Sequence, residues 1–311
     1  MVGGTLRRFD YFVPQRLAPG AAMLLVFHGG SGSPAQIRRF TDRGFEAIAQ
    51  QDGAIVVYPA GVGGNWNSCQ KGRKNVATQR NVDELGFVQA MVDWFAAQHQ
   101  IDTKRVYAFG YSNGGHLCFR LAQALPERLA GVVAVAANRP AASDSKCPML
   151  PVSVPVLIIN GTADPINPFG GGELSPYGLR RLGPVLSALE TAASFAPAGS
   201  LLRRSGRAQA RADWVERYAW QLGGRDQVVL LLVHGGGHTI PQPLCKQPWV
   251  FGRTSTAIDA MAESWKFFKG LPARRVAGHV NARPASNGGR DEAAMPTRPA
   301  AVAAVQAGAQ P

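Results

Sequence analysis

The sequence lacks the long apolar segments that would place it in a membrane. None of its apolar runs reaches the 18 or more residues that a membrane-spanning helix requires, so no membrane partner is expected. Residues 1–10 lack the apolar core of a secretory signal. As written, the chain is expected to stay in the cytoplasm. A true start upstream, with an export signal, would instead make it extracellular.

Cysteine is scarce, with four residues among 311. Four are too few for a disulfide scaffold, and their spacing matches neither CxxC nor a metal site, so no metal and no cofactor are expected. Cys118 lies in an apolar helical stretch and is expected to be buried. Cys147 and Cys245 lie in proline-rich loops and could pair if the protein is exported. The sequence leaves that pairing open.

Acidic residues are also few, because 20 Asp and Glu stand against 33 Lys and Arg, a formal net charge of +13. Such an excess favours anionic surfaces and substrates and is typical of many nucleic-acid-binding proteins. No zinc-finger spacing, RNA-binding aromatic motif or basic heptad accompanies it. The charge is spread along the chain apart from one dense patch, at Arg203, Arg204, Arg207 and Arg211. We therefore expect a solvated basic surface and no nucleic-acid partner.

The carboxyl-terminal segment, residues 271–311, contains no Phe, Trp, Tyr or Ile and is dominated by Ala, Gly, Pro and Arg. It cannot bury enough apolar surface to offset the entropy of ordering it. We expect a disordered tail over 271–311. The remaining residues 1–270 fit one large domain better than two small ones.

Short β-branched apolar runs alternate with segments of helical period along this domain. The runs predict strands at Met23–Phe27, Ala54–Tyr58, Arg105–Phe109, Val132–Val135, Val156–Asn160 and Val228–Val233. Helices are predicted at Ile37–Gln51, Val82–Gln98, Asn113–Leu125, Pro184–Phe195 and Ser255–Lys269. Apolar strands separated by helices imply an α/β fold with a mostly parallel sheet covered on both faces. Sites on such sheets lie in the loops after the strands.

The loop after the third predicted strand reads Gly-Tyr-Ser-Asn-Gly-Gly over 110–115 and leads directly into a helical run. This is a G-x-S-x-G elbow in its required context, where glycines permit a sharp turn that exposes the strained Ser112 hydroxyl. The helix that follows directs free N–H groups at negative charge developing near Ser112. The alternative is a glycine-rich turn without chemistry.

The loop after the first strand reads His28-Gly29-Gly30 and is typical of esterases, in which it donates one N–H group to the oxyanion. We assign the oxyanion hole to the N–H groups of Gly30 and Asn113. A phosphate cradle is the alternative, but the sequence lacks Gly-Lys-Ser/Thr. His28 is expected to brace the loop and not to act as a base.

Two further loops supply an acid and a base. Asp164 follows a buried strand, and His238 follows three glycines after the last strand, so the chain order is Ser, Asp, His. Asp164 would hold the imidazole of His238, the general base, in the correct tautomer. Alone, Asp164 would be an ordinary turn residue. His234 ends the strand and is expected to pack there.

These motifs together resemble the polyhydroxybutyrate depolymerase and feruloyl esterase group of α/β-hydrolases, which also includes acetylxylan esterases. The resemblance covers about residues 5–269. It rests on an ordered set of segments: His28–Gly30, Asn65–Asn67, Asn81–Glu84, Gly110–Gly115, Gly161–Asp164, Gly170–Gly171 and Gly236–Thr239. The resemblance implies an ester hydrolase with the triad Ser112, Asp164 and His238.

The predicted function is hydrolysis of carboxylic esters through an acyl-enzyme, with 3-hydroxybutyrate esters or feruloyl and acetyl esters as substrates. A serine peptidase and a non-catalytic binding protein on the same scaffold are the alternatives.

Trp66 is expected either to line the cleft and stack on substrate or to be a buried core residue. Gly178–Arg211 is rich in Arg and follows the acid loop, where a substrate rim would lie. Asn81 and Glu84 are expected to form a helix cap and its capping-box partner. The oligomeric state stays open.

Overall fold

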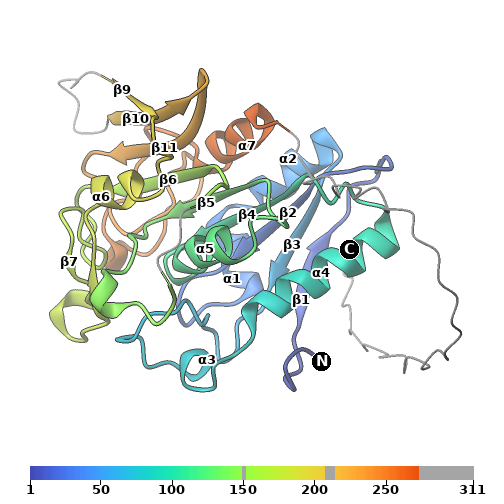
Figure 1. The fold of residues 1–311 in the computed structure, drawn as a ribbon, viewed down its shortest axis with the longest axis horizontal. Coiled ribbons are helices and arrows are strands. Elements are labelled where there is room, and N and C mark those ends of the chain that lie inside the picture. The colour runs from blue at the N-terminus through green and yellow to red at the C-terminus, as the bar shows by residue number, and fades with distance from the viewer. Residues whose placement is uncertain (149–151, 207–213, 273–311) are drawn as a thin grey trace, which may run out of the picture.

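A computed structural model describes residues 1–148, 152–206 and 214–272. Its centre is a nine-stranded sheet of order β1-β3-β2-β4-β5-β6-β11-β10-β9 (Figure 1). The strands are β1 (Phe9–Phe12), β2 (Met23–Phe27), β3 (Ile55–Pro59), β4 (Val106–Tyr111), β5 (Gly131–Val135), β6 (Val156–Gly161), β9 (Leu201–Ser205), β10 (Val215–Leu222) and β11 (Arg225–Val233). The six neighbours from β3 to β11 run parallel, and antiparallel pairing is confined to β1 at one edge and to β9 and β10 at the other.

Helices cover both faces of this sheet (Figure 1). One face is packed by α4 (Glu84–His99), α5 (Asn113–Ala124) and α6 (Ala188–Ala193), and the other by α1 (Pro34–Phe40), α2 (Gly44–Asp52) and α7 (Ala260–Gly270). Smaller elements are α3 (Val76–Gln79), the hairpin of β7 (Gly172–Glu173) and β8 (Pro184–Val185), and the 3-10 turns η1 (Ala142–Asp144), η2 (Pro176–Gly178) and η3 (Trp249–Phe251).

The alternation of side chains along the strands explains this layered arrangement. In β2, Met23, Leu25 and Phe27 belong to the core beneath α4 and α5, whereas Leu24 and Val26 belong to the core beneath α1, α2 and α7. Successive strand residues point to opposite faces, so a strand that is apolar throughout needs helices on both sides. The predicted α/β-hydrolase fold class is confirmed.

Three predicted helices differ from those in the structure. Of the predicted helix Ser255–Lys269, the first turn is absent, because α7 begins only at Ala260, after its cap Asp259. The segment Ile37–Gln51 is two helices, because Asp42 and Arg43 adopt left-handed backbone conformations with φ of 47° and 53°. Of the predicted helix Pro184–Phe195, Pro184 and Val185 form β8, and the helix itself begins only after Ser187, which caps it. The cap of α4 is Asp83, not Asn81.

Glu84, the predicted capping-box partner, is instead buried in an ion pair with Arg7, at 2.7 Å. Burial raises the pKa of this carboxyl, against the opposing effect of Arg7. Most of the predicted tail lies outside the described residues, as do Arg207 and Arg211. The division into residues 1–270 and a disordered tail therefore stays a prediction.

The structure decides the cysteine pairing that the sequence left open. Cys147 forms a disulfide with Cys69, 78 residues away, and Cys245 is a free thiol. Cys118 is buried in α5, as its apolar surroundings predicted. Within the described ranges, no helix is both long enough and apolar enough to cross a membrane.

Candidate active site

Ser112 lies between the end of β4 and the start of α5, at the carboxyl edge of the parallel strands. Its backbone has φ of 53° and ψ of −115°, a conformation that non-glycine residues rarely adopt. A Cβ added at Gly110 would lie 2.1 Å from the Gly114 carbonyl oxygen, and one at Gly114 would lie 2.4 Å from the Phe27 carbonyl oxygen. Both glycines of the motif are therefore required by close backbone contacts.

Three sequence-predicted residues come together at this elbow. His238 Nε2 lies 2.8 Å from Ser112 Oγ, and His238 Nδ1 lies 2.8 Å from Asp164 Oδ2. The side chains of His238 and Asp164 are 4% and 1% exposed, so water hardly competes for this contact. A nucleophile, a general base and an acid that orients the base require this chain of two hydrogen bonds, which is called the relay below.

Backbone contacts fix the acid and the base. Asp164 Oδ1 accepts hydrogen bonds from the N–H groups of Ile166 and Asn167, each at 2.8 Å, which leaves Oδ2 for His238. The His238 carbonyl accepts from the Tyr111 hydroxyl at 2.6 Å, and its N–H donates to the Phe251 carbonyl at 2.6 Å. The backbone of His238 is thus held by Tyr111 at the end of β4 and by Phe251 in η3, and this fixes where its imidazole lies.

The two predicted oxyanion donors are neighbours. Asn113 is the first residue of α5, and the first N–H groups of a helix have no partner within that helix. A Cβ added at Gly30 would lie 3.8 Å from Asn113 Cβ, so the His-Gly-Gly loop passes directly beside the elbow. The two residues whose N–H groups are predicted to form the oxyanion hole therefore lie side by side next to Ser112.

His28 and Trp66 hold the His-Gly-Gly loop in place through buried hydrogen bonds. His28 Nε2 accepts a hydrogen bond from the Gly61 N–H at 3.0 Å, and Nδ1 lies 2.7 Å from the Gly29 carbonyl oxygen. Burial lowers the pKa of His28, so it stays neutral as a brace. Trp66 is fully buried, donates from Nε1 to the His28 carbonyl at 2.8 Å, and packs on Phe27. Of the two alternatives for Trp66, the structure shows the buried core residue and not the cleft residue, because the Trp66 side chain has no exposed surface.

His234 lies apart from this relay. Its ring stacks on Trp214 with centroids 3.8 Å apart, and its Nε2 lies 3.4 Å from Glu216 Oε2. This placement agrees with the expectation that the strand-ending histidine packs.

A cavity of about 240 Å³ opens beside Ser112 and His238. Its walls come from the His-Gly-Gly loop, the segment 65–75, the acid loop through Leu182, and Phe251. Sequence reasoning missed Arg73, which lines this cavity, and placed Arg180 only within a general Arg-rich rim. Leu174 and Leu182 give the cavity an apolar side.

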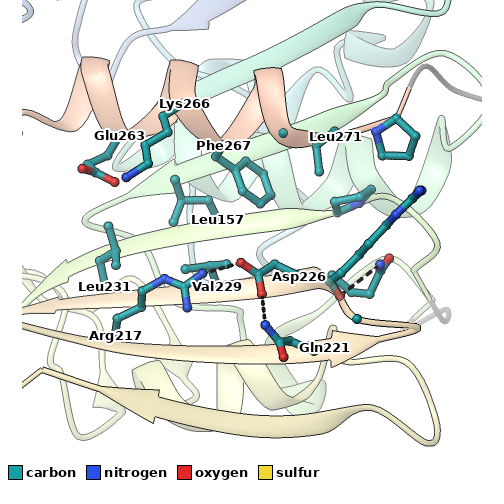
Figure 2. Close-up of a pocket in the computed structure, with 16 residues that line it drawn as sticks. Leu157, Arg217, Gln221, Asp226, Val229, Leu231, Glu263, Lys266, Phe267 and Leu271 are labelled. Carbon is teal, nitrogen blue, oxygen red and sulfur yellow. Dashed lines mark hydrogen bonds and ion pairs between the residues drawn. The ribbon is translucent and has the colours of Figure 1, made fainter.

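A larger cavity of about 600 Å³ lies between α7 and the starts of β6 and β11, and Figure 2 shows its lining. Leu157, Val229 and Phe267 form its apolar wall, and Asp226 pairs with Arg217 and Gln221 at its rim. It lies near the start of β11, whereas His238 follows the end of that strand, so it has no part in the relay. Among the described residues, no group of three or more His, Cys, Asp or Glu is arranged to hold a metal.

Comparison with known proteins places the chain among esterases. Residues 43–146 match the prolyl oligopeptidase family. The candidate esterase NocK of Nocardia uniformis subsp. tsuyamanensis is 31% identical over 266 residues, which cover 82% of this chain and 76% of NocK. Poly(3-hydroxyalkanoate) depolymerase C of Paucimonas lemoignei is 29% identical, over 43% of this chain and 31% of its own length.

A solved acetyl xylan esterase from Aspergillus awamori has the same fold, with a TM-score of 0.54 and 16% identity over 84% of this chain and 93% of its own. Together with the glycine-flanked serine at the strand–helix turn, these likenesses make the chain a serine esterase-type hydrolase. It belongs to the α/β-hydrolase family that includes polyhydroxybutyrate depolymerases, feruloyl esterases and acetylxylan esterases.

Proposed function

We propose that this hydrolase cleaves carboxylic esters by two-step acyl transfer on Ser112. His238 takes the proton from Ser112 Oγ, Oγ attacks the ester carbonyl carbon, and Asp164 stabilises the imidazolium that forms. The N–H groups of Gly30 and Asn113 hold the oxyanion. His238 then protonates the leaving alcohol, and water repeats the attack on the acyl-enzyme.

One observation carries this proposal: the pair of 2.8 Å contacts that joins Ser112 Oγ, the two nitrogens of His238 and Asp164 Oδ2. A nucleophile needs its base within about 2.6–3.2 Å, and the base needs a third group that fixes its tautomer. The strained backbone of Ser112 is a second support, because such strain is typical of a nucleophile elbow.

We infer small or oligomeric esters as the substrates, of the 3-hydroxybutyrate or the feruloyl and acetyl kind. The relatives named for such esters support the chemistry. The burial of Trp66 removes the aromatic residue that the sequence offered for stacking on a feruloyl group. Tyr177 and Phe251 line the cavity, so both acyl classes stay candidate substrates. The volume of about 240 Å³ beside Ser112 suits a short acyl chain.

The test is hydrolysis of methyl ferulate and of a 3-hydroxybutyrate trimer, side by side, by the purified full chain and by Ser112→Ala. We expect the wild type to cleave at least one of them and Ser112→Ala to lose most of a rate gain of order 10⁶. Circular dichroism of both proteins checks that the variant is folded. Near-normal hydrolysis by folded Ser112→Ala would remove Ser112 from the mechanism.

A serine peptidase is the second candidate, because residues 43–146 match the prolyl oligopeptidase family. That stretch contains Ser112 but neither Asp164 nor His238, so it supports the shared elbow more than a peptide substrate. A panel of aryl-amide peptides, measured beside the two esters, separates the candidates. Peptides cleaved faster than both esters would favour the peptidase.

A further inference from the structure

A buried arginine without a carboxylate partner faces the catalytic cavity. Arg73 is 8% exposed and lines the cavity beside Ser112. Its Nε donates to Gln70 Oε1 at 2.9 Å, and no carboxylate in the described part of the chain lies within ion-pair distance of its guanidinium. A buried cation without an ionic partner is costly, and such groups are typical of binding sites.

Arg73 lies next to one of the proposed oxyanion donors. A Cβ added at Gly30 would lie 3.6 Å from Arg73 Nη1. A chain of hydrogen bonds also links Arg73 to Asn113, the other donor, through Gln70 Oε1 and Ser68 Oγ, at 2.9, 3.2 and 3.3 Å. The guanidinium is therefore fixed in position relative to the point where the ester carbonyl would sit.

The loop that carries Arg73 is held rigidly. The Cys69–Cys147 disulfide ties it to the segment around η1. The N–H groups of Lys71 and Gly72 donate to Asp144, at 2.8 and 2.7 Å, and the Lys146 N–H donates to the Cys69 carbonyl at 2.7 Å. A preorganised arginine loses little entropy when it binds an anion.

Arg180 adds a second positive charge to the same cavity. It is exposed on the segment after the acid loop, and no Asp or Glu is among the residues that line the cavity. Burial, followed by the neighbouring charge of Arg180, lowers the pKa of Arg73 to about 10, which leaves it cationic at neutral pH. Asp144 is the nearby attractive charge, but no ion-pair contact joins it to Arg73 in the described part of the chain, and its Oδ1 accepts from the Gly72 N–H.

We propose that Arg73, assisted by Arg180, binds a carboxylate of the substrate, so that the preferred esters are anionic and carry this carboxylate a few atoms from the scissile carbonyl. The proposal rests on the ester hydrolysis proposed above and adds its substrate class. Arginine pairs with a carboxylate through two parallel N–H···O bonds, which a neutral isostere cannot accept as strongly. Hydrogen bonds to a charged group correspond to about ten- to hundredfold in binding.

The test compares two pairs of esters in which each pair differs only in a carboxylate or a primary amide. Ethyl hydrogen glutarate and ethyl glutaramate place the group on the acyl side, and 3-acetoxybutyrate and 3-acetoxybutyramide place it on the alcohol side. We measure kcat and KM for each from released ethanol or acetate, with Ser112→Ala as the blank. We expect the wild type to prefer the carboxylate at least about tenfold in kcat/KM in one pair, mainly through a lower KM, and that pair shows the side on which the carboxylate sits.

Substitutions test which residues cause the preference for the carboxylate ester over the amide ester. Arg73→Gln should abolish it while the amide ester is still hydrolysed, and Arg73→Lys should restore part of it. Arg180→Gln, on an exposed side chain that the fold does not need, should lower the ratio about two- to fivefold. Arg225→Gln, which removes a positive charge at the far cavity, is the matched control and should leave the ratio unchanged.

Equal kcat/KM for carboxylate and amide in both pairs would overturn the proposal that Arg73 binds a carboxylate. The proposed ester hydrolysis would not be affected by that result. An equal loss on both members of a pair in folded Arg73→Gln would also overturn it, because Arg73 would then serve the oxyanion or the fold. If Arg73→Gln does not fold, an unchanged ratio in Arg180→Gln is the overturning result. No Ser112-dependent hydrolysis of any of the four esters would instead count against the proposed function, and this inference would fall with it.

Discussion

Ser112 has a backbone conformation that costs free energy and is held by its surroundings. Such conformations cost of order 1–3 kcal/mol each. The cost is offset here because the Ser112 N–H donates to the Val135 carbonyl at 2.8 Å and its carbonyl accepts from the His116 N–H at 3.0 Å. A Cβ added at Gly29 would lie 3.5 Å from Ser112 Cβ, so the His-Gly-Gly loop closes the other side. The hydroxyl is thereby directed at His238.

At the same scale, we expect Asp164→Asn to lower kcat by about 10⁴ on any ester that the wild type cleaves. An amide at this position can donate to His238 Nδ1, which would hold the imidazole in the tautomer that cannot accept the Ser112 proton. Steady-state kinetics with the better of methyl ferulate and the 3-hydroxybutyrate trimer measures the loss.

Glu216→Gln is the matched control for this substitution. Glu216 is also buried and also faces a histidine, His234. It lies on β10, which β5, β6 and β11 separate from β4 in the sheet, and β4 is the strand that leads to Ser112. It should change kcat less than threefold. A folded Asp164→Asn protein with kcat within tenfold of the wild type would contradict the assigned role of Asp164.

At the scale of elements, the central strands could be predicted because each is buried on both faces and therefore reads as an unbroken apolar run. The edge strands could not. β9 reads Leu-Leu-Arg-Arg-Ser and is exposed throughout, and β1 is only partly buried, so neither has the apolar signal of a central strand. Their pairing is decided by strands outside each run: β1 pairs with β3, beyond β2 in the chain, and β9 pairs with the following strand, β10.

The same reason limits prediction of the site. Ser112, Asp164 and His238 each carry a local signature, a glycine-flanked turn or loop directly after a strand. Arg73 and Trp66 have none, because their roles come from contacts with Gly30 and His28 that are more than 35 residues away. The partner of Cys147 likewise follows from the path of the whole loop, not from composition around either cysteine.

The Cys69–Cys147 disulfide closes a loop of 78 residues, and we expect its loss to destabilise the protein by about 2–4 kcal/mol. Cross-linking restricts the unfolded chain, so urea unfolding of Cys147→Ser should show a lower midpoint and a steeper slope, because the unfolded chain without the bond is more expanded and exposes more surface. Because the bond also ties down the loop of Arg73, the variant should bind substrate more weakly as well.

Cys245→Ser is the control, since Cys245 is a free thiol outside this loop. Its unfolding midpoint should match the wild type. Equal stability of Cys147→Ser and Cys245→Ser under oxidising conditions would mean that the disulfide does not stabilise the fold.

At the scale of the whole molecule, stability depends on two buried histidines that the folded chain keeps neutral, although the chain carries a net charge of +13. Burial lowers the pKa of His116 well below 6.5, and the nearby charge of Arg73 adds to this effect. Burial also lowers the pKa of His28. Both side chains belong to elements that shape the site, α5 and the His-Gly-Gly loop, so protonating either would disturb the packing around Ser112.

We therefore expect the free energy of unfolding to fall as the pH drops from 7.5 to 5.5. The unfolded chain takes up protons on these histidines near pH 6.5, whereas the folded chain does so only at lower pH, so the unfolded state gains stability in this window. Each such histidine contributes a slope of up to about 1.4 kcal/mol per pH unit. Urea unfolding at three pH values measures how the free energy of unfolding changes with pH. His116→Met should lower this slope by up to about 1.4 kcal/mol per pH unit, because one proton fewer is taken up on unfolding. A slope that is the same in both proteins would show that His116 titrates alike in the folded and unfolded states.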